Sequence, residues 1–209
     1  MYIPDYFQIH DPETIAEFMR KHSFATIVTY FEHSSFATHM PVLLERRSGP
    51  YGTLVSHLAR ANPQARHFEN GQEALIIFQG PHAYVSPSWY TAAPAVPTWN
   101  YTAVHAYGIP RLITDPERLI TLLRDLVEYF EAPRSDRWSG EMPEDYRDRM
   151  IKGLVGVEME ITRVEAKYKL SQNRQPEDRD RVAEALRKSS DQTERETGEM
   201  MVRRENGMP

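Results

Sequence analysis

The chain has 209 residues, a formal net charge of −5, a hydrophobic share of 40% and no cysteine. A chain of this length fits one ordinary domain with an appendage. The lack of cysteine excludes disulfides, thiolate catalysis and zinc–thiolate sites. It also suits a reducing compartment, so we expect a cytoplasmic protein.

The beginning of the chain and its apolar runs give no sign of export or membrane insertion. Residues 1–10 include Asp5 and lack the basic and apolar regions of a signal peptide. No apolar run approaches the roughly 18 residues that a membrane helix needs. We therefore expect no contact with a membrane.

The charge pattern does not favour direct binding to DNA, which requires a basic stripe against the phosphates. The segment 134–152 is rich in charge, but its five basic residues are balanced by five acidic ones. Direct DNA binding is therefore doubtful on charge alone.

The first half of the chain is predicted to form mainly short strands. Asp11, Pro12 and Glu13 form a helix-start signal, which predicts a helix over 11–22. Alternating β-branched and aromatic residues predict strands over 24–31, 36–45 and 53–58, with an edge or bulge at Pro41. Asn62-Pro63 predicts a short helix to about Phe68. Strands then follow over 74–79 and 82–86, joined by a turn at Gly80-Pro81.

The second half alternates between the two kinds of element. Strands are predicted over 98–108, 109–113 and 155–170. A second Asp-Pro-Glu signal at 115–117 predicts a helix to Phe130, and shorter helices are predicted over 143–154 and 179–187. This order indicates a mainly β, α+β fold, an antiparallel barrel with peripheral helices. We expect one domain over 1–188 and a polar, flexible tail over 189–209.

The segment 55–63 is the first that carries chemistry. A strand ends there, Arg60 follows, and Asn62 and Pro63 begin a helix. Unpaired N–H groups at a helix start attract anions, and the guanidinium of Arg60 and hydroxyl of Ser56 suit a phosphate. The pattern predicts a mononucleotide phosphate site. An ordinary strand-to-helix turn with a solvated arginine explains the spacing about equally well.

The segment 74–114 is aromatic and nearly uncharged. Its one charged residue is Arg111, and it includes Trp89, Trp99 and several tyrosines. Aromatic side chains with polar tips suit a flat ligand or a subunit interface. A buried pair of core strands is the alternative, but the prolines of this segment make it poor core material.

The segment 166–173 places Lys167 and Lys169 at a strand end, followed by Ser171, Gln172 and Asn173. Such donors suit the polar edge of a flavin ring or a phosphate. A solvated strand end is the simpler reading of the segment by itself.

The histidines and serines do not form a recognised catalytic or metal motif. The sequence contains no HExxH spacing, so we expect no metal site. Ser56 and Ser86 lack a nucleophile elbow, which makes serine hydrolase chemistry improbable.

Taken together, these segments resemble the FMN-binding negative transcriptional regulators of the PaiB type. The pieces that carry the resemblance occur in order over residues 1–188: MYIP, THMP at 38–41, SHLARANP at 56–63, YVSPSWY at 84–90, VPTWNY at 96–101 and KYKLSQN at 167–173. The two tryptophan-containing pieces, at their observed separation, are specific for this family, whereas any one piece alone is weak evidence for the resemblance.

The resemblance implies a split β-barrel, like that of the pyridoxamine-phosphate oxidases, with FMN held between the two subunits of a homodimer. Ser56, Arg60 and Asn62 would hold the phosphate and ribityl chain, with His57 in the same motif. Around the rest of the cofactor, the resemblance places His39, Met40, Trp99, Asn100, Tyr101, Val104, Lys169 and Gln172.

Three functions stay open at this point. The first is a flavin-binding negative regulator or sensor that acts through partners, and the second is an FMN-dependent oxidoreductase, since relatives reduce flavins or degrade haem. The third, a flavin-free DNA-binding repressor, is disfavoured by the charge pattern.

Overall fold

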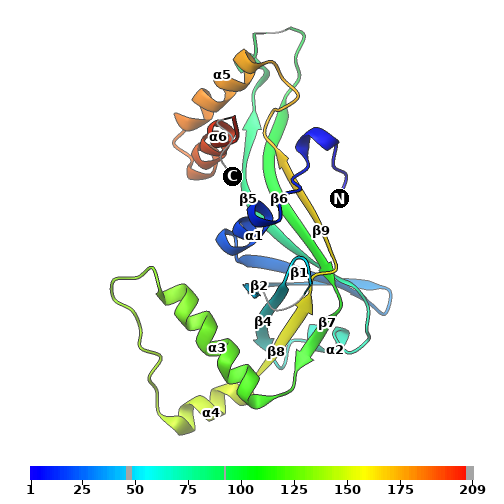
Figure 1. Ribbon diagram of the computed structural model, residues 1–209, viewed down its shortest axis with the longest axis vertical. Coiled ribbons are helices and arrows are strands. Elements are labelled where there is room, and N and C mark those ends of the chain that lie inside the picture. The colour runs from blue at the N-terminus through cyan, green and yellow to red at the C-terminus, as the bar shows by residue number, and fades with distance from the viewer. Residues whose placement is uncertain (46–48, 92, 206–209) are drawn as a thin grey trace. The chain divides into compact units, whose positions relative to one another are not determined.

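The computed structural model describes residues 1–45, 49–91 and 93–205 (Figure 1). The helices are α1 (Pro12–Lys21), α2 (Gln64–His67), α3 (Pro116–Glu131), α4 (Glu144–Lys152), α5 (Pro176–Arg187) and α6 (Gln192–Glu205), with 3-10 turns η1 (Asp5–Phe7) and η2 (Pro87–Trp89). The strands are β1 (Phe24–Phe31), β2 (Ser34–Pro41), β3 (Leu43–Glu45), β4 (Thr53–Ala59), β5 (Ala74–Val85), β6 (Thr98–Gly108), β7 (Pro110–Ile113), β8 (Leu154–Glu160) and β9 (Arg163–Lys169).

The strands form two sheets. One has the order β2-β1-β5-β6-β9 and the other the order β3-β4-β8-β7. The pairs β1–β2, β1–β5, β3–β4, β4–β8 and β7–β8 are antiparallel. The expected α+β class with antiparallel strands and peripheral helices is therefore confirmed.

The chain divides into two compact units. Unit 1 comprises Met1–His22, Phe78–His105 and Glu165–Pro209, and unit 2 comprises Ser23–Ile77 and Ala106–Val164. Strands β5, β6 and β9 each contribute residues to both units.

The capping signals are confirmed at both Asp-Pro-Glu sites. The Asp11 carboxylate accepts a hydrogen bond from the Thr14 N–H at 2.8 Å, and the Asp115 carboxylate accepts one from the Glu117 N–H at 3.1 Å. Each cap satisfies a backbone donor that the first helical turn leaves free. The prediction of an edge at Pro41 is also confirmed, because β2 ends the order of the five-stranded sheet.

Gly80-Pro81 lies inside the continuous strand β5, so the predicted turn there is wrong. A Cβ on Gly80 would lie 2.3 Å from the Thr102 Oγ1 and 2.7 Å from the Phe18 ring. Both contacts are within unit 1. The glycine serves close packing, and the strand passes through it without reversing.

The segment predicted as one strand over 155–170 is two strands, one in each sheet. β8 belongs to the four-stranded sheet and β9 to the five-stranded sheet. Between them the Thr162 N–H donates to the Tyr107 carbonyl at 2.9 Å, which holds the crossover against the end of β6.

The C-terminal segment also differs from the flexible tail expected after Ser189. Residues 192–205 form α6, and Thr197 and Met201 are buried. A Cβ on Gly198 would lie 2.9 Å from the Ala183 carbonyl oxygen of α5, so the two helices approach closely. The small contact residues allow this packing although the helix is polar overall. Residues 206–209 lie outside the described chain.

The core of unit 2 places α3 against the four-stranded sheet. Its buried cluster consists of Leu43, Val55, Ile113, Leu119, Leu122 and Leu126. Beside it, the Arg118 guanidinium pairs with the largely buried Glu45 carboxylate at 2.8 Å. This layer fixes α3 over β4, the strand that leads into the predicted phosphate segment.

His22 at the end of α1 predicts a pH dependence of stability. Burial, and then the charge of Lys21, lowers the pKa of His22 from its ordinary 6.5 to about 4. Between those values the unfolded chain binds a proton that the folded chain does not. Stability is therefore retained above pH 6.5 and falls as the pH drops towards 4. Because the ring is partly exposed, we expect a loss of about 1–2 kcal/mol.

Urea denaturation at pH 7 and pH 4.5 checks this expectation. The wild type should lose more stability between the two pH values than His22→Gln does. An equal loss in both proteins would show that His22 does not contribute.

Candidate functional site

The predicted phosphate segment in unit 2 is a closed turn. The Asn62 side-chain oxygen accepts from the Gln64 N–H at 2.9 Å. The Ala65 N–H donates to the Asn62 carbonyl and the Arg66 N–H to the Pro63 carbonyl, both at 3.1 Å. The N–H groups that we expected to be free for an anion are therefore used inside the turn. In the structure, this helix start does not offer the free N–H groups on which the predicted phosphate site depended.

The side chains of this segment also have partners within unit 2. The Arg60 guanidinium donates to the carbonyls of Lys152 at 3.0 Å and Leu154 at 2.9 Å, while remaining exposed. The hydroxyl of the buried Ser56 donates to the Pro41 carbonyl. Arg60 and Ser56 thus connect β4 to neighbouring backbone, and a ligand at Arg60 could use only its remaining N–H groups.

The histidines of unit 2 differ in accessibility. His39 is exposed on β2, where its Nδ1 shares a hydrogen bond with the Thr26 hydroxyl at 2.8 Å. Its neighbour Met40 is only 3% exposed. His57 is half-buried, and burial lowers its pKa, which favours the neutral ring. Of His39, Met40 and His57, His39 is the most accessible to a ligand.

Trp99 gives unit 1 an accessible aromatic surface. Its side chain is 53% exposed on β6. The Tyr84 ring meets it edge-on at 6.0 Å between centroids, and the His82 ring lies at 6.2 Å. An exposed indole with aromatic neighbours can stack against a flat ring system. Trp99 is therefore suited to the role that the resemblance implies.

Asn100 and Val104, also expected to line the ring, are fully buried. The Asn100 amide donates to the Ser171 hydroxyl at 3.0 Å and accepts from it at 3.1 Å. A second contact runs from the same amide nitrogen to the Met201 sulfur at 3.4 Å. These contacts make Asn100 a structural link between β6 and the end of β9.

Lys169 brings positive charge next to Trp99. Its ammonium donates to the Thr98 hydroxyl at 2.6 Å and to the Trp99 carbonyl. Burial, and then the charges of Lys167 and Arg174, lowers the pKa of Lys169. A cation held beside other cations, at the backbone of the strand that carries the exposed Trp99, is suited to a ligand that combines an anionic group with a flat ring.

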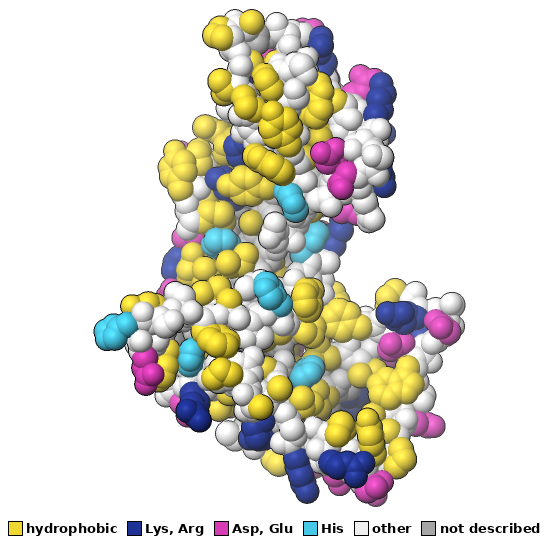
Figure 2. Space-filling view, turned by 180° about the vertical axis from the view of Figure 1, so that it is seen from behind, with side chains coloured by type: hydrophobic (Ala, Val, Ile, Leu, Met, Phe, Trp, Pro, Cys, Tyr) yellow, Lys and Arg dark blue, Asp and Glu magenta, His cyan; other side chains and the backbone are white. Residues whose placement is uncertain are grey.

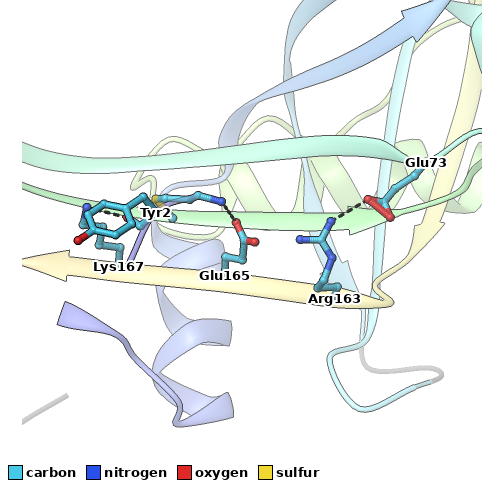
Figure 3. A network of polar contacts seen from close by, with 6 residues as sticks. Tyr2, Glu73, Arg163, Glu165 and Lys167 are labelled. Atoms are coloured by element: carbon cyan, nitrogen blue, oxygen red, sulfur yellow. Dashed lines mark hydrogen bonds and ion pairs between the residues drawn. The ribbon is translucent and has the colours of Figure 1, made fainter. Parts of the chain in front are cut away.

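Two neighbours of Lys169 have other partners. The Lys167 ammonium donates to the Tyr2 carbonyl at 3.0 Å (Figure 3). It also lies 5.0 Å from the Tyr101 ring centroid. The Gln172 side chain turns back, accepting from the Leu170 N–H at 2.7 Å and donating to the Tyr168 carbonyl at 2.6 Å. Gln172 therefore closes the strand end. Of the two lysines, Lys169 is the less buried and the better suited to a ligand, although its ammonium already has two acceptors.

Polar contacts hold β9 along its length (Figure 3). In unit 1 the N-terminal amine pairs with the Glu165 carboxylate. Within unit 2 the Arg163 guanidinium pairs with the Glu73 carboxylate at 2.8 Å and lies 3.5 Å from the Tyr107 ring centroid. These contacts fix the strand that carries Lys169.

Arg174 and Tyr84 are not among the residues that the sequence assigned to the site, and Lys167 was expected only as a possible donor in the segment of Lys169. Arg174 lies 4.4 Å from the Tyr90 ring centroid. The alternation of Lys167 and Lys169 on one strand was a usable signal, because residues two apart point to the same face. The described residues contain no group of three or more potential metal ligands, and none of their helices could span a membrane.

The sequence matches the family described as "Putative FMN-binding domain" over residues 1–163. It is also 37% identical over 203 residues to "Protease synthase and sporulation protein PAI 2" of Bacillus subtilis, covering 96% of each chain. The chain belongs to this FMN-binding domain family. The predicted resemblance to PaiB-type proteins is thereby confirmed.

Another relative of this family member is "Uncharacterized protein AN0679" of Emericella nidulans. It is 32% identical over 182 residues, which cover 70% of this chain and 72% of the relative.

Solved structures establish the fold of this family member. The flavocytochrome Anf3 from Azotobacter vinelandii matches with a TM-score of 0.61 at 16% identity, covering 80% of this chain and 72% of that one. The FAD and heme binding protein from Mycobacterium smegmatis matches with a TM-score of 0.58 at 16% identity, covering 78% and 73%. At this identity the matches show the fold alone, which is the predicted split β-barrel.

Proposed function

We propose that this chain binds FMN and acts as a flavin-dependent negative regulator or sensor. The observation that carries the proposal is the exposed indole of Trp99 on β6, a strand whose Thr98 hydroxyl and Trp99 backbone carbonyl accept from the Lys169 ammonium, in a chain of the FMN-binding domain family. The relative PAI 2 is named for protease synthesis and sporulation. A regulatory output through partners agrees with the net charge of −5, which opposes direct DNA binding.

In this proposal the groups that hold the cofactor lie in unit 1. Trp99 offers the stacking surface for the isoalloxazine, with Tyr101 near it on β6, and Lys169 donates to the anionic or carbonyl edge of the cofactor. The exposed Arg60 of unit 2 is tested separately. Bound FMN would supply the capacity to accept and release electrons, while the chain binds and orients it.

We further propose that the working form is a homodimer with FMN at the subunit interface. The nearly uncharged segment 74–114 supports this, because Tyr84, Val96 and Trp99 expose 42%, 67% and 53% of their surface. Such apolar exposure is typical of an interface or ligand surface. Light scattering should give twice the chain mass, and a monomer mass at micromolar concentration would refute the dimer.

Lys169→Gln is expected to weaken FMN binding roughly 10- to 100-fold, the scale of a hydrogen bond to a charged group. Flavin fluorescence titration measures the affinity. Lys188→Gln is the matched control, since Lys188 is an exposed lysine on the far end of α5 that pairs with Glu184. An unchanged affinity in Lys169→Gln would remove this lysine from the site.

Arg60→Ala forms the second arm of the same titration. A loss of affinity would place the phosphate at Arg60 despite the carbonyl partners of its guanidinium. With affinity unchanged in Arg60→Ala but lowered in Lys169→Gln, the phosphate would be assigned to unit 1.

A second candidate function is an FMN oxidoreductase acting on a small substrate. It is favoured by the structural neighbours, which are named as a flavocytochrome and a FAD and heme binding protein. Anaerobic addition of NADH or NADPH to the flavin-loaded protein discriminates between the two functions. Bleaching of the flavin absorbance supports an oxidoreductase, and no bleaching with either donor counts against it.

A further inference from the structure

Unit 2 contains a cavity that the proposed flavin site does not use. It has a volume of about 640 Å³ and lies between α3, α4 and the connecting loop. Its apolar wall consists of Ile120, Leu123, Val127, Met142, Met150 and Ile151. The volume falls in the range of small-molecule sites, about 300–1,000 Å³.

The loop that borders this cavity is held in place by polar contacts. The Trp138 backbone N–H donates to the Glu131 carboxylate at 3.0 Å, and Glu131 also pairs with Arg134 at 3.6 Å. The Arg137 guanidinium donates to the Ala132 carbonyl. The indole of Trp138 is thereby kept at the cavity, with 48% of its surface exposed. The cavity is a formed feature of α3, α4 and their loop.

The charges around the cavity balance one another. Arg147 is paired with Asp148 at 3.0 Å and with Glu144 at 3.7 Å. The remaining lining charges are Arg124 and Glu128, which lie one turn apart on α3, and Glu131 and Arg137, so that each sign occurs twice. Figure 2 shows hydrophobic side chains gathered around α3 and α4, at the lower right of the view, with basic and acidic side chains between them. The lining therefore gives no net attraction to an anion or a cation.

His57 adds one polar group to the lining. Its Nδ1 is buried and has no hydrogen-bond partner among the residues that the structure describes. Buried polar atoms normally have a partner, and an imidazole kept neutral by burial can donate to a carbonyl or accept from a hydroxyl. Because Nδ1 is also inaccessible to water, a ligand oxygen in the cavity would pair with the other ring nitrogen, Nε2, or with Nδ1 only after the ring turns over.

We propose that this cavity binds a small neutral molecule, mainly apolar and aromatic or alicyclic, with one hydroxyl or carbonyl oxygen that pairs with His57. The apolar walls take up the body of the ligand, and the balanced charges at the rim disfavour ionised compounds. The site goes beyond the proposed flavin function, because the α3 and α4 residues that form its walls are not among those proposed to bind FMN. For a regulator it would be a place to receive a second chemical signal.

Ligand-observed ¹⁹F NMR with 4-(trifluoromethyl)phenol tests the proposal. Its signal should broaden and shift saturably with the full chain. Trifluoromethylbenzene, which lacks the hydroxyl, should bind at least several-fold more weakly, and 4-(trifluoromethyl)benzoate should show no saturable binding. Equal binding of all three, or no binding of the phenol at millimolar concentration, would overturn the proposal.

Val127→Trp locates the binding by filling the cavity, and should weaken phenol binding at least tenfold. Ile109→Trp is the matched control, since Ile109 is 45% exposed and does not line the cavity. Met150→Glu provides a second variant that should fold, because Met150 is 45% exposed, and its added charge should also weaken binding. Unchanged binding in a folded Val127→Trp or Met150→Glu would refute the location. Phenol binding that disappears as the chain dimerises would show instead that a second copy occupies this face.

Discussion

Replacing Asn100 by leucine is expected to lower the free energy of unfolding by about 3–4 kcal/mol. Asn100 is fully buried and exchanges two hydrogen bonds with Ser171, which is itself buried. Leucine has a similar size, so the loss comes from the hydrogen bonds and from the Ser171 hydroxyl that is left without its partner. Urea denaturation followed by circular dichroism measures the change.

Two further variants make the Asn100 expectation specific. The double variant Asn100→Leu/Ser171→Ala lacks the unpaired Ser171 hydroxyl, so it should recover part of the stability that Asn100→Leu loses. Asn173→Leu, at an exposed position nearby, should change stability by no more than about 0.5 kcal/mol. If Asn100→Leu folds as stably as the wild type, Asn100 is not the link that its contacts indicate.

Leu122→Ala is expected to cost about 4 kcal/mol, because Leu122 is fully buried at the centre of the α3 cluster and alanine leaves a cavity there. Leu123→Ala, on the same helix but only partly buried beside that cluster, should cost clearly less. Arg124→Ala, at an exposed position, provides the baseline. Equal losses in Leu122→Ala and Leu123→Ala would mean that α3 does not pack on the sheet as described.

Local signals in the sequence predicted most elements of the fold. The Asp-Pro-Glu starts of α1 and α3 and the alternation of β1 are determined by residues within one or two turns. The turn predicted at Gly80-Pro81 is wrong because the neighbouring sequence does not distinguish a glycine required for close packing from a glycine required for a turn. The helix α6 was missed because its buried face consists of small residues and Met201, which give a weak apolar pattern.

The candidate site was harder to predict than the fold, since its residues have partners far along the chain. The carbonyls that engage Arg60 are 92 and 94 residues away, and Ser171 is 71 residues from Asn100. No local pattern reveals such contacts, so a donor that looked available proved to be engaged. Trp99 and Lys169 remained good candidates because the Trp99 side chain is exposed and the Lys169 ammonium donates to the Trp99 backbone carbonyl.

FMN titration of the purified chain tests the central claim most directly, with the visible absorption spectrum recorded before any addition. We expect flavin bands near their usual visible positions after mixing and gel filtration, and saturable quenching of flavin fluorescence at one FMN per chain. A protein that is colourless after gel filtration and leaves flavin fluorescence unchanged at tens of micromolar would contradict the account.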